Sequence, residues 1–360
     1  MKLVNTKTIK PGAVLAQSIY NENGVVLISS GMSLTDKVIR RLINYGITYV
    51  YIEDERTKDI YVESLIPDKL RTEATRTIKD TFTEIKKQGI MEKSYILDKK
   101  GKELMDVVKK LTEEIKNNDQ SLSMLTDIFL TDNYIFQHSL NVAIYSLAIG
   151  VNLNFTNKKL MDIGIGSLLH DVGKIFIEQD ILQKPDRLSD EEFEIVKNHT
   201  VLGYRFLSKN GGVPSVVAHC AYEHHERLDG SGYPRGLVGN ELHTYAKVIG
   251  VADVFDAVTS NRVYRDAMLP HEGLEILYAG AVHLFDKEMV EAFKKSIVVF
   301  PIGLSVELSD GRKGVVARQN QHLCDRPVIR VVKEKETEVA PYEIDLSKVL
   351  NLTIVSVMKD

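Results

Sequence analysis

Residues 122 to 297 form a continuous succession of segments in which apolar side chains recur with the period of an α-helix. Runs of β-branched residues in this stretch are too short and too scattered to build a sheet. We therefore predict an all-helical domain over residues 122–298, and we expect the chain as a whole to be mainly α.

The start of the chain has a different character, which predicts a small α+β module over residues 1–60. Strand-like residues 13–20 and 25–28 flank a turn at Asn23-Gly24, a pattern typical of a β-hairpin. A short amphipathic helix and a further strand follow.

Strand-like alternation returns near the end of the chain and predicts a small β-rich module over residues 299–360. The predicted strands are residues 305–308, 314–317, 327–332 and 352–357. Residues 61–121 are polar and charged with helical apolar stripes, so we expect them to form a helical connector.

Composition and charge limit the classes of function. The 360 residues carry a formal net charge of -4, which argues against binding to a nucleic-acid polymer but allows a local basic pocket for a small anion. The first residues lack the apolar core of a secretory signal, and no run reaches the roughly 18 apolar residues of a membrane span. A cytoplasmic protein without membrane insertion is expected. The two cysteines, Cys220 and Cys324, are expected to be small buried groups.

An adjacent pair, His170-Asp171, has the chemistry of a metal site. It follows the apolar run 163–169, which should be a buried helix that ends near Gly173. Two polar groups at the end of a buried helix need partners, because an unpaired polar group inside a protein is strongly unfavourable. A divalent metal is such a partner, and the two oxygens of Asp171 allow it to bridge two ions.

A second pair, His224-His225, lies between a helix that Pro214 can start and a loop rich in glycine. Both rings could serve one ion only near a helix end, where the pair is expected to lie. Asp253 and Asp256 share an apolar helix, so one can be a metal ligand while the other holds a ligand in place.

The candidate ligands offer nitrogen and oxygen donors without a thiolate. Such a set suits iron, manganese, cobalt, nickel or zinc and disfavours a closed structural zinc site. We expect two divalent ions, with iron or manganese preferred. The candidate ligands are His138, His170, Asp171, His199, His224, His225 and Asp253.

The sequence around these residues resembles the HD-GYP family of cyclic dinucleotide phosphodiesterases. Residues 170–174 read HDVGK with Lys184-Pro185 after them, and residues 224–234 read HHERLDGSGYP. Residues 253–257 and 260–265 continue the match in the expected order. The resemblance covers residues 122–297 and is specific, because the broader HD superfamily shares the His-Asp pair but not the second motif.

The resemblance implies how the ligands divide between the two metals. One ion would be held by His138, His170, Asp171 and Asp253, and the other by Asp171, His199, His224 and His225. Some members of the family bind a third ion through a glutamate one helical turn before the first histidine. Tyr134 occupies that position here, so two ions are expected.

The implied activity is hydrolysis of cyclic di-GMP to linear pGpG, to GMP or to both, by a hydroxide that bridges the two metals. Asp171 and Lys174 are the expected catalytic residues, and Lys174 would also contact the substrate. Arg262, Arg265 and Tyr233 are expected to bind the substrate, since a guanidinium fork suits a phosphate. For these four side chains a purely structural role is the alternative.

Other functions stay open at this point. Another HD-type phosphohydrolase would act on nucleoside triphosphates or stringent-response nucleotides, but the Gly-Tyr-Pro loop argues against it. Cyclic GMP-AMP could be the substrate, because no guanine-reading residue can be identified from spacing. A non-catalytic cyclic dinucleotide receptor would be expected to have lost metal ligands. The terminal modules could pair subunits in a homodimer or bind a signalling protein.

Overall fold

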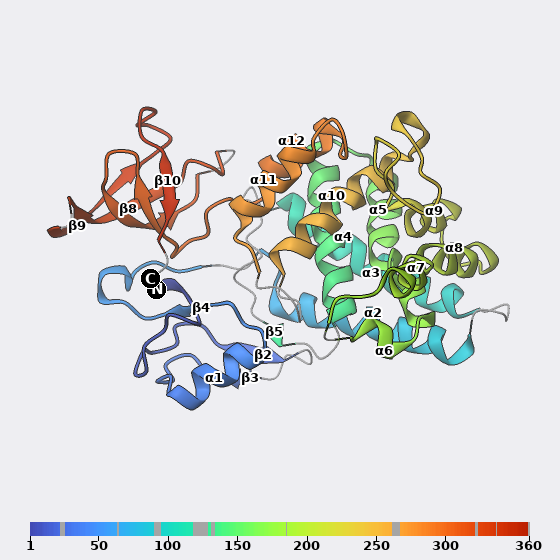
Figure 1. Cartoon of the computed structure of the whole chain (residues 1–360), viewed down its shortest axis with the longest axis horizontal. Coiled ribbons are helices and arrows are strands. Elements are labelled where there is room, and N and C mark those ends of the chain that lie inside the picture. Colours follow the sequence, from blue (N-terminus) through green and yellow to red (C-terminus); the bar gives the residue numbers. More distant parts are fainter. Residues whose placement is uncertain are drawn as a thin grey trace.

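A computed structural model of the chain describes residues 1–21, 26–62, 65–89, 95–117, 129–130, 134–184, 186–260, 267–320, 323–335 and 337–358. Helices form one large body, and two small modules lie at one end of it (Figure 1). One module comes from the start of the chain and the other from its end.

The N-terminal module packs short strands around a helix. The strands pair antiparallel, β1 with β4 and β2 with β3. The helix begins after Thr35, whose hydroxyl caps it, and it buries Ile39 and Leu42. The elements are β1 (Lys2–Asn5), β2 (Ile19–Asn21), β3 (Val26–Ile28), α1 (Asp36–Asn44), β4 (Tyr49–Ile52) and the 3-10 helix η1 (Glu55–Thr57).

The strand predicted over residues 13–20 forms only at its end, as β2. The amide of Leu15 donates to the carbonyl of Met32 at 2.9 Å, and the amide of Ala16 donates to that of Tyr51 at 2.8 Å. Because these two partners belong to different segments, the chain here makes isolated bridges instead of following one neighbouring strand. The predicted turn at Asn23-Gly24 lies outside the described residues.

The helical body has one continuous hydrophobic core. The two long helices α2 and α3, in the region expected to be a connector, contribute Phe82 and Val108 to the same core as the helices that follow. The helices are α2 (Asp68–Gln88), α3 (Ile96–Asn117), α4 (Tyr134–Asn152), α5 (Asn157–Leu169), η2 (Val172–Phe176), α6 (Gln179–Leu182), α7 (Asp190–Lys197), α8 (His199–Lys209), α9 (Ser215–Glu223), η3 (Gly239–Glu241), α10 (Thr244–Thr259), α11 (Pro270–Gly280) and α12 (Lys287–Ser296). Among the described residues, no helix is both long and apolar enough to cross a membrane. Cys220 and Cys324 are buried free thiols, as expected.

The prediction of an all-helical domain over residues 122–298 is wrong at one place. The strand β5 (Phe129–Leu130) precedes α4 and pairs parallel with β2. The edge of β2 that faces away from β3 is free to accept such a partner, and an unpaired strand edge readily does so.

The C-terminal module is a five-stranded antiparallel sheet, which confirms the predicted β-rich module. Its strand order is β10-β6-β7-β8-β9, and its strands are β6 (Ser305–Leu308), β7 (Lys313–Arg318), β8 (Val328–Glu334), β9 (Thr337–Asp345) and β10 (Ile354–Val357). The two terminal modules touch directly, since the amide of Leu3 donates to the carbonyl of Gly303 at 2.8 Å. Leu3 and Tyr51 also pack in one core with Val306 and Ile329.

Candidate metal centre

The His170-Asp171 pair is fully buried between the end of α5 and the start of η2. Gly173, in η2, allows α8 to pack directly on this junction. A Cβ on Gly173 would lie 1.9 Å from the carbonyl oxygen of His199 and 2.7 Å from the amide nitrogen of Gly203. The absence of a side chain therefore brings His199, at the start of α8, against Asp171.

Three histidine rings are held in the same way, through Nδ1. The Nδ1 atoms of His170, His199 and His224 each lie within hydrogen-bond distance of the main-chain carbonyl three residues earlier, at 2.7, 2.6 and 3.0 Å. A carbonyl oxygen only accepts, so Nδ1 carries the proton in each ring. The Nε2 atom of each ring then faces the interior of the cluster.

His138 is held by an acid instead of a carbonyl. Its Nδ1 lies 2.7 Å from Oδ2 of Asp256, whose other oxygen accepts from the amide of Asn141 at 2.8 Å. Its Nε2 lies 3.1 Å from Oδ1 of Asp253. Of the two acids on α10, Asp256 thus orients a histidine while Asp253 faces the cluster.

The two carboxylate oxygens of Asp171 face different histidines. Oδ1 lies 3.3 Å from Nε2 of His199 and 3.7 Å from Nε2 of His224. Oδ2 lies 3.5 Å from the Nε2 atoms of both His138 and His170. The potential donors accordingly form two groups that share Asp171, one with His199, His224 and His225 and the other with His138 and His170.

Asp253 lies beside both groups. Its Oδ1 approaches His138, and its Oδ2 lies 3.7 Å from Nδ1 of His225. The structure therefore brings together all seven residues that the sequence analysis selected as ligands, from α4, α8, α10 and the ends of α5 and α9.

Burial and charge set the protonation of this cluster. Burial lowers the pKa of His170 to about 4 and that of His199 to about 3, so both rings are neutral near pH 7. Burial also opposes protonation of His138, but the carboxylates of Asp253 and Asp256 outweigh it and raise its pKa to about 9. Burial likewise opposes ionisation of Asp171, yet the positive charge of Lys174 holds its pKa well below the usual range.

The unprotonated atoms at the centre fit a divalent metal. Nε2 of His170 and Oδ1 of Asp171 are buried and have no hydrogen-bond partner among the described residues. The Nε2 atoms of His199 and His224 both face this centre and lie 3.3 Å apart. Buried polar atoms need a partner. Neutral imidazoles and carboxylates are the forms that bind such ions.

The remaining predicted site residues have different positions. Nζ of Lys174 lies 2.5 Å from Oδ2 of Asp171, at the edge of the cluster. The ring of Tyr233 stacks on that of His225, with centroids 4.6 Å apart and an interplanar angle of 27°. Arg262 and Arg265 lie outside the described residues.

The loop after His225 is held by a buried acid that the sequence analysis did not select. Glu226 accepts the amide of Arg235 at 2.7 Å on one oxygen and the amide of Leu237 at 2.9 Å on the other. A Cβ on Gly232 would lie 2.5 Å from the carbonyl oxygen of His225, so the loop folds tightly back on that residue. An acid directly after two candidate ligand histidines is a signal that could have identified Glu226.

Comparison with known proteins agrees with this geometry. A family model described as HD domain matches residues 109–289, half of the chain. The chain is 34% identical over 279 residues to a cyclic di-GMP phosphodiesterase from Thermotoga maritima, covering 76% of this chain and 72% of that protein. The chain belongs to the HD-GYP family of HD domain proteins.

Two further comparisons describe this HD-GYP protein. It is 32% identical over 234 residues to the cyclic di-GMP phosphodiesterase PA4108 from Pseudomonas aeruginosa, covering 65% of this chain. The match spans 56% of that relative's length. The solved structure of Bd1817, described as a HDG"Y"P protein from Bdellovibrio bacteriovorus, has a TM-score of 0.52 at 18% identity, and the match covers 81% of this chain and 97% of that one. This likeness confirms the HD-type fold.

Proposed function

We propose that this chain is a metal-dependent phosphodiesterase that hydrolyses cyclic di-GMP to linear pGpG, to GMP or to both. The observation that carries the proposal is the carboxylate of Asp171, because each of its oxygens faces a separate set of imidazole nitrogens. A carboxylate shared in this way suits two ions. Two relatives that bear the name cyclic di-GMP phosphodiesterase support the choice of substrate.

The ions, iron or manganese, would each be held by four residues. One would take His138, His170, Asp171 and Asp253, and the other Asp171, His199, His224 and His225. When bound, two such ions lower the pKa of a water and neutralise charge on the phosphate oxygens. The absence of thiolates from the donor set supports hard or borderline metals.

Side chains around the centre would handle the substrate. Lys174 stands beside Asp171 with its side chain 20% exposed, so it can reach a phosphate or give a proton to the leaving ribose oxygen. Tyr233 keeps one ring face on His225, and its loop would border the bound nucleotide. Arg262 and Arg265 are proposed to grip the phosphates as bidentate forks.

The surroundings of the reaction are part of the same proposal. Cyclic di-GMP as the substrate and a formal net charge of -4 suit a protein of the cytoplasm. The terminal modules, which share a core with each other, would pair subunits or receive a signalling partner.

Turnover of cyclic di-GMP by anaerobically purified protein, with its bound metals counted, tests the proposal. We expect linear dinucleotide or GMP and about two metals per chain, and we expect Asp171→Ala to lose both the metals and the turnover. Metal-replete protein that binds cyclic di-GMP without cutting it would instead be a receptor. Parallel reactions with cyclic GMP-AMP test the alternative substrate. A kcat/KM higher than that for cyclic di-GMP would make cyclic GMP-AMP the preferred substrate.

A further inference from the structure

The short helix α7 lies next to the metal centre without burying any of its residues. A surface helix normally turns an apolar face to the core. On α7, by contrast, the side chains of Phe193 and Ile195 are 45% and 44% exposed. The apolar surface of this helix is therefore presented to solvent.

Phe193 is connected to the centre through one intervening ring. Its ring meets that of Tyr233 edge to face, with centroids 6.4 Å apart, and Tyr233 stacks on His225. A nucleobase is separated from its phosphate by one ribose. A base whose phosphate lies at the metals could therefore reach an aromatic surface one ring beyond Tyr233.

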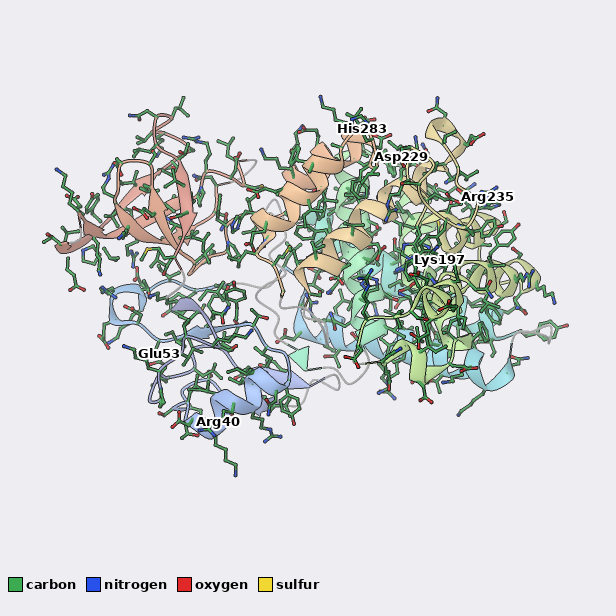
Figure 2. All side chains as sticks on the ribbon, in the orientation of Figure 1. Arg40, Glu53, Lys197, Asp229, Arg235 and His283 are labelled. Carbon is green, nitrogen blue, oxygen red and sulfur yellow. The ribbon has the colours of Figure 1, made fainter. Side chains whose placement is uncertain are left out.

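A cation completes this surface. Nζ of Lys197 lies 4.9 Å from the ring centroid of Phe193 and 5.5 Å from that of Tyr233. The same ammonium is 2.5 Å from Oε1 of Glu194. Aromatic rings with an ammonium beside them can bind a ligand that has both a flat ring and a negative charge, as a nucleotide does. Lys197 is labelled in Figure 2 on the helical body, well away from Arg40 and Glu53 of the N-terminal module.

Side-chain contacts hold the start of α7. Ser189 and Glu192 form a reciprocal capping box at its start. Lys184 contacts both carboxylate oxygens of Glu192 at 2.7 Å. These contacts order the helix that carries Phe193, and a surface that is ordered beforehand loses less entropy when it takes up a ligand.

We propose that Phe193 and Lys197, here called the α7 platform, stack and neutralise one nucleotide unit of the cyclic dinucleotide beside the metals. The inference rests on the proposed function and deepens it, since it assigns a base-binding surface to the same site. Stacking of a base on an aromatic side chain changes affinity by roughly 5- to 150-fold.

Steady-state kinetics of Phe193→Ala and Ile195→Ala test the platform. The two residues lie on one helix with almost equal exposure, so Ile195→Ala controls for loss of apolar surface. We expect Phe193→Ala to raise KM for cyclic di-GMP about tenfold or more. Its ratio of kcat/KM for cyclic di-GMP over methyl p-nitrophenyl phosphate, a diester without a nucleobase, should fall by a similar factor. Equal behaviour of the two variants while the wild type turns over would overturn the platform and leave the proposed function standing. A metal-replete wild type that cuts no cyclic dinucleotide would instead defeat the proposed function.

A tryptophan reporter gives a second test that keeps an aromatic ring on α7. The chain contains no tryptophan, so Phe193→Trp and Ile195→Trp each give a single emitter. Stacking on guanine should quench the emission of Phe193→Trp when cyclic di-GMP is mixed in a stopped-flow instrument, and Ile195→Trp should stay unchanged. No quenching in Phe193→Trp during measurable turnover would overturn the platform.

Discussion

Replacing Gly173 with alanine tests whether the contact between η2 and α8 sets the geometry of the centre. The new Cβ would lie 1.9 Å from the carbonyl oxygen of His199, whereas ordinary contact begins at 3.4 Å. The three nearest atoms, two of His199 and one of Gly203, belong to the backbone and cannot rotate away as a side chain can. The start of α8 must then retreat by about 1.5 Å, and His199 retreats with it.

This displacement is large for a metal site, where ligand distances tolerate about 0.2 Å. We expect Gly173→Ala to lose metal and to lower kcat/KM at least about 100-fold, since misplacement by about 1 Å has that effect on a catalytic group. Overpacking should also lower the free energy of unfolding by about 1–3 kcal/mol.

Metal analysis, kinetics and urea unfolding measure these effects, with Gly211→Ala as the matched control. A Cβ on Gly211 would meet Asp98 at an ordinary 3.6 Å, so the control should stay within about 0.5 kcal/mol of the wild type. If Gly173→Ala keeps its metals and wild-type turnover, the reasoning about this backbone contact is refuted.

The remaining predictions concern Asp256, the bound metal and pH. Asp256→Asn removes the charge that holds His138 and should weaken metal affinity about 10- to 100-fold in a competition titration, and unchanged affinity would contradict its orienting role. Removing metal with a chelator should lower the free energy of unfolding, by about 2.7 kcal/mol if the free metal concentration was 100 times its Kd. An unfolding transition that is the same with and without metal would argue against metal binding to the native state. In chelated protein, burial opposes protonation of His138, but Asp253 and Asp256 raise its pKa to about 9. The protonated ring therefore contributes fully to the free energy of unfolding below pH 6.5, and this contribution is lost as pH rises through 9. Burial lowers the pKa of His199 to about 3, so this ring stays neutral and the fold weakens as pH falls below 6.5. Urea unfolding of the chelated protein should show greatest stability near pH 6.5, and a steady rise or fall from pH 5 to 9 would be the contrary result.

Long elements with a strong apolar pattern could be predicted from the sequence. The apolar runs in α5 and α10 identify buried helices, and β6 has the predicted bounds, residues 305–308. The edge strand β9 could not be predicted in this way, because its residues are exposed or half-buried along its whole length and show no apolar alternation. The two-residue strand β5 depends on a partner more than 100 residues earlier, which no local pattern reveals.

The centre could be predicted in part from chemistry alone. His170-Asp171 and His224-His225 stand out because adjacent polar groups at the ends of apolar helices need partners. His138 carries no such local signal, because no histidine or acid stands next to it in the sequence. Its anchor, Asp256, lies 118 residues away.

The surroundings of the centre depend on tertiary contacts that the sequence does not display. The contact of Phe193 with Tyr233 joins a helix to a loop 40 residues later. The hydrogen bonds of Glu226 reach nine and eleven residues along the chain, and they exist only because the loop folds back. Polar residues of this kind look like ordinary surface groups until the fold brings their partners close.

Anomalous diffraction from crystals of anaerobically purified protein, collected on both sides of the metal absorption edge, tests the shared carboxylate most directly. We predict two peaks, one beside Oδ1 of Asp171 near His199 and one beside Oδ2 near His138. A single peak, or two peaks of which only one contacts Asp171, would contradict a dinuclear centre bridged by this residue.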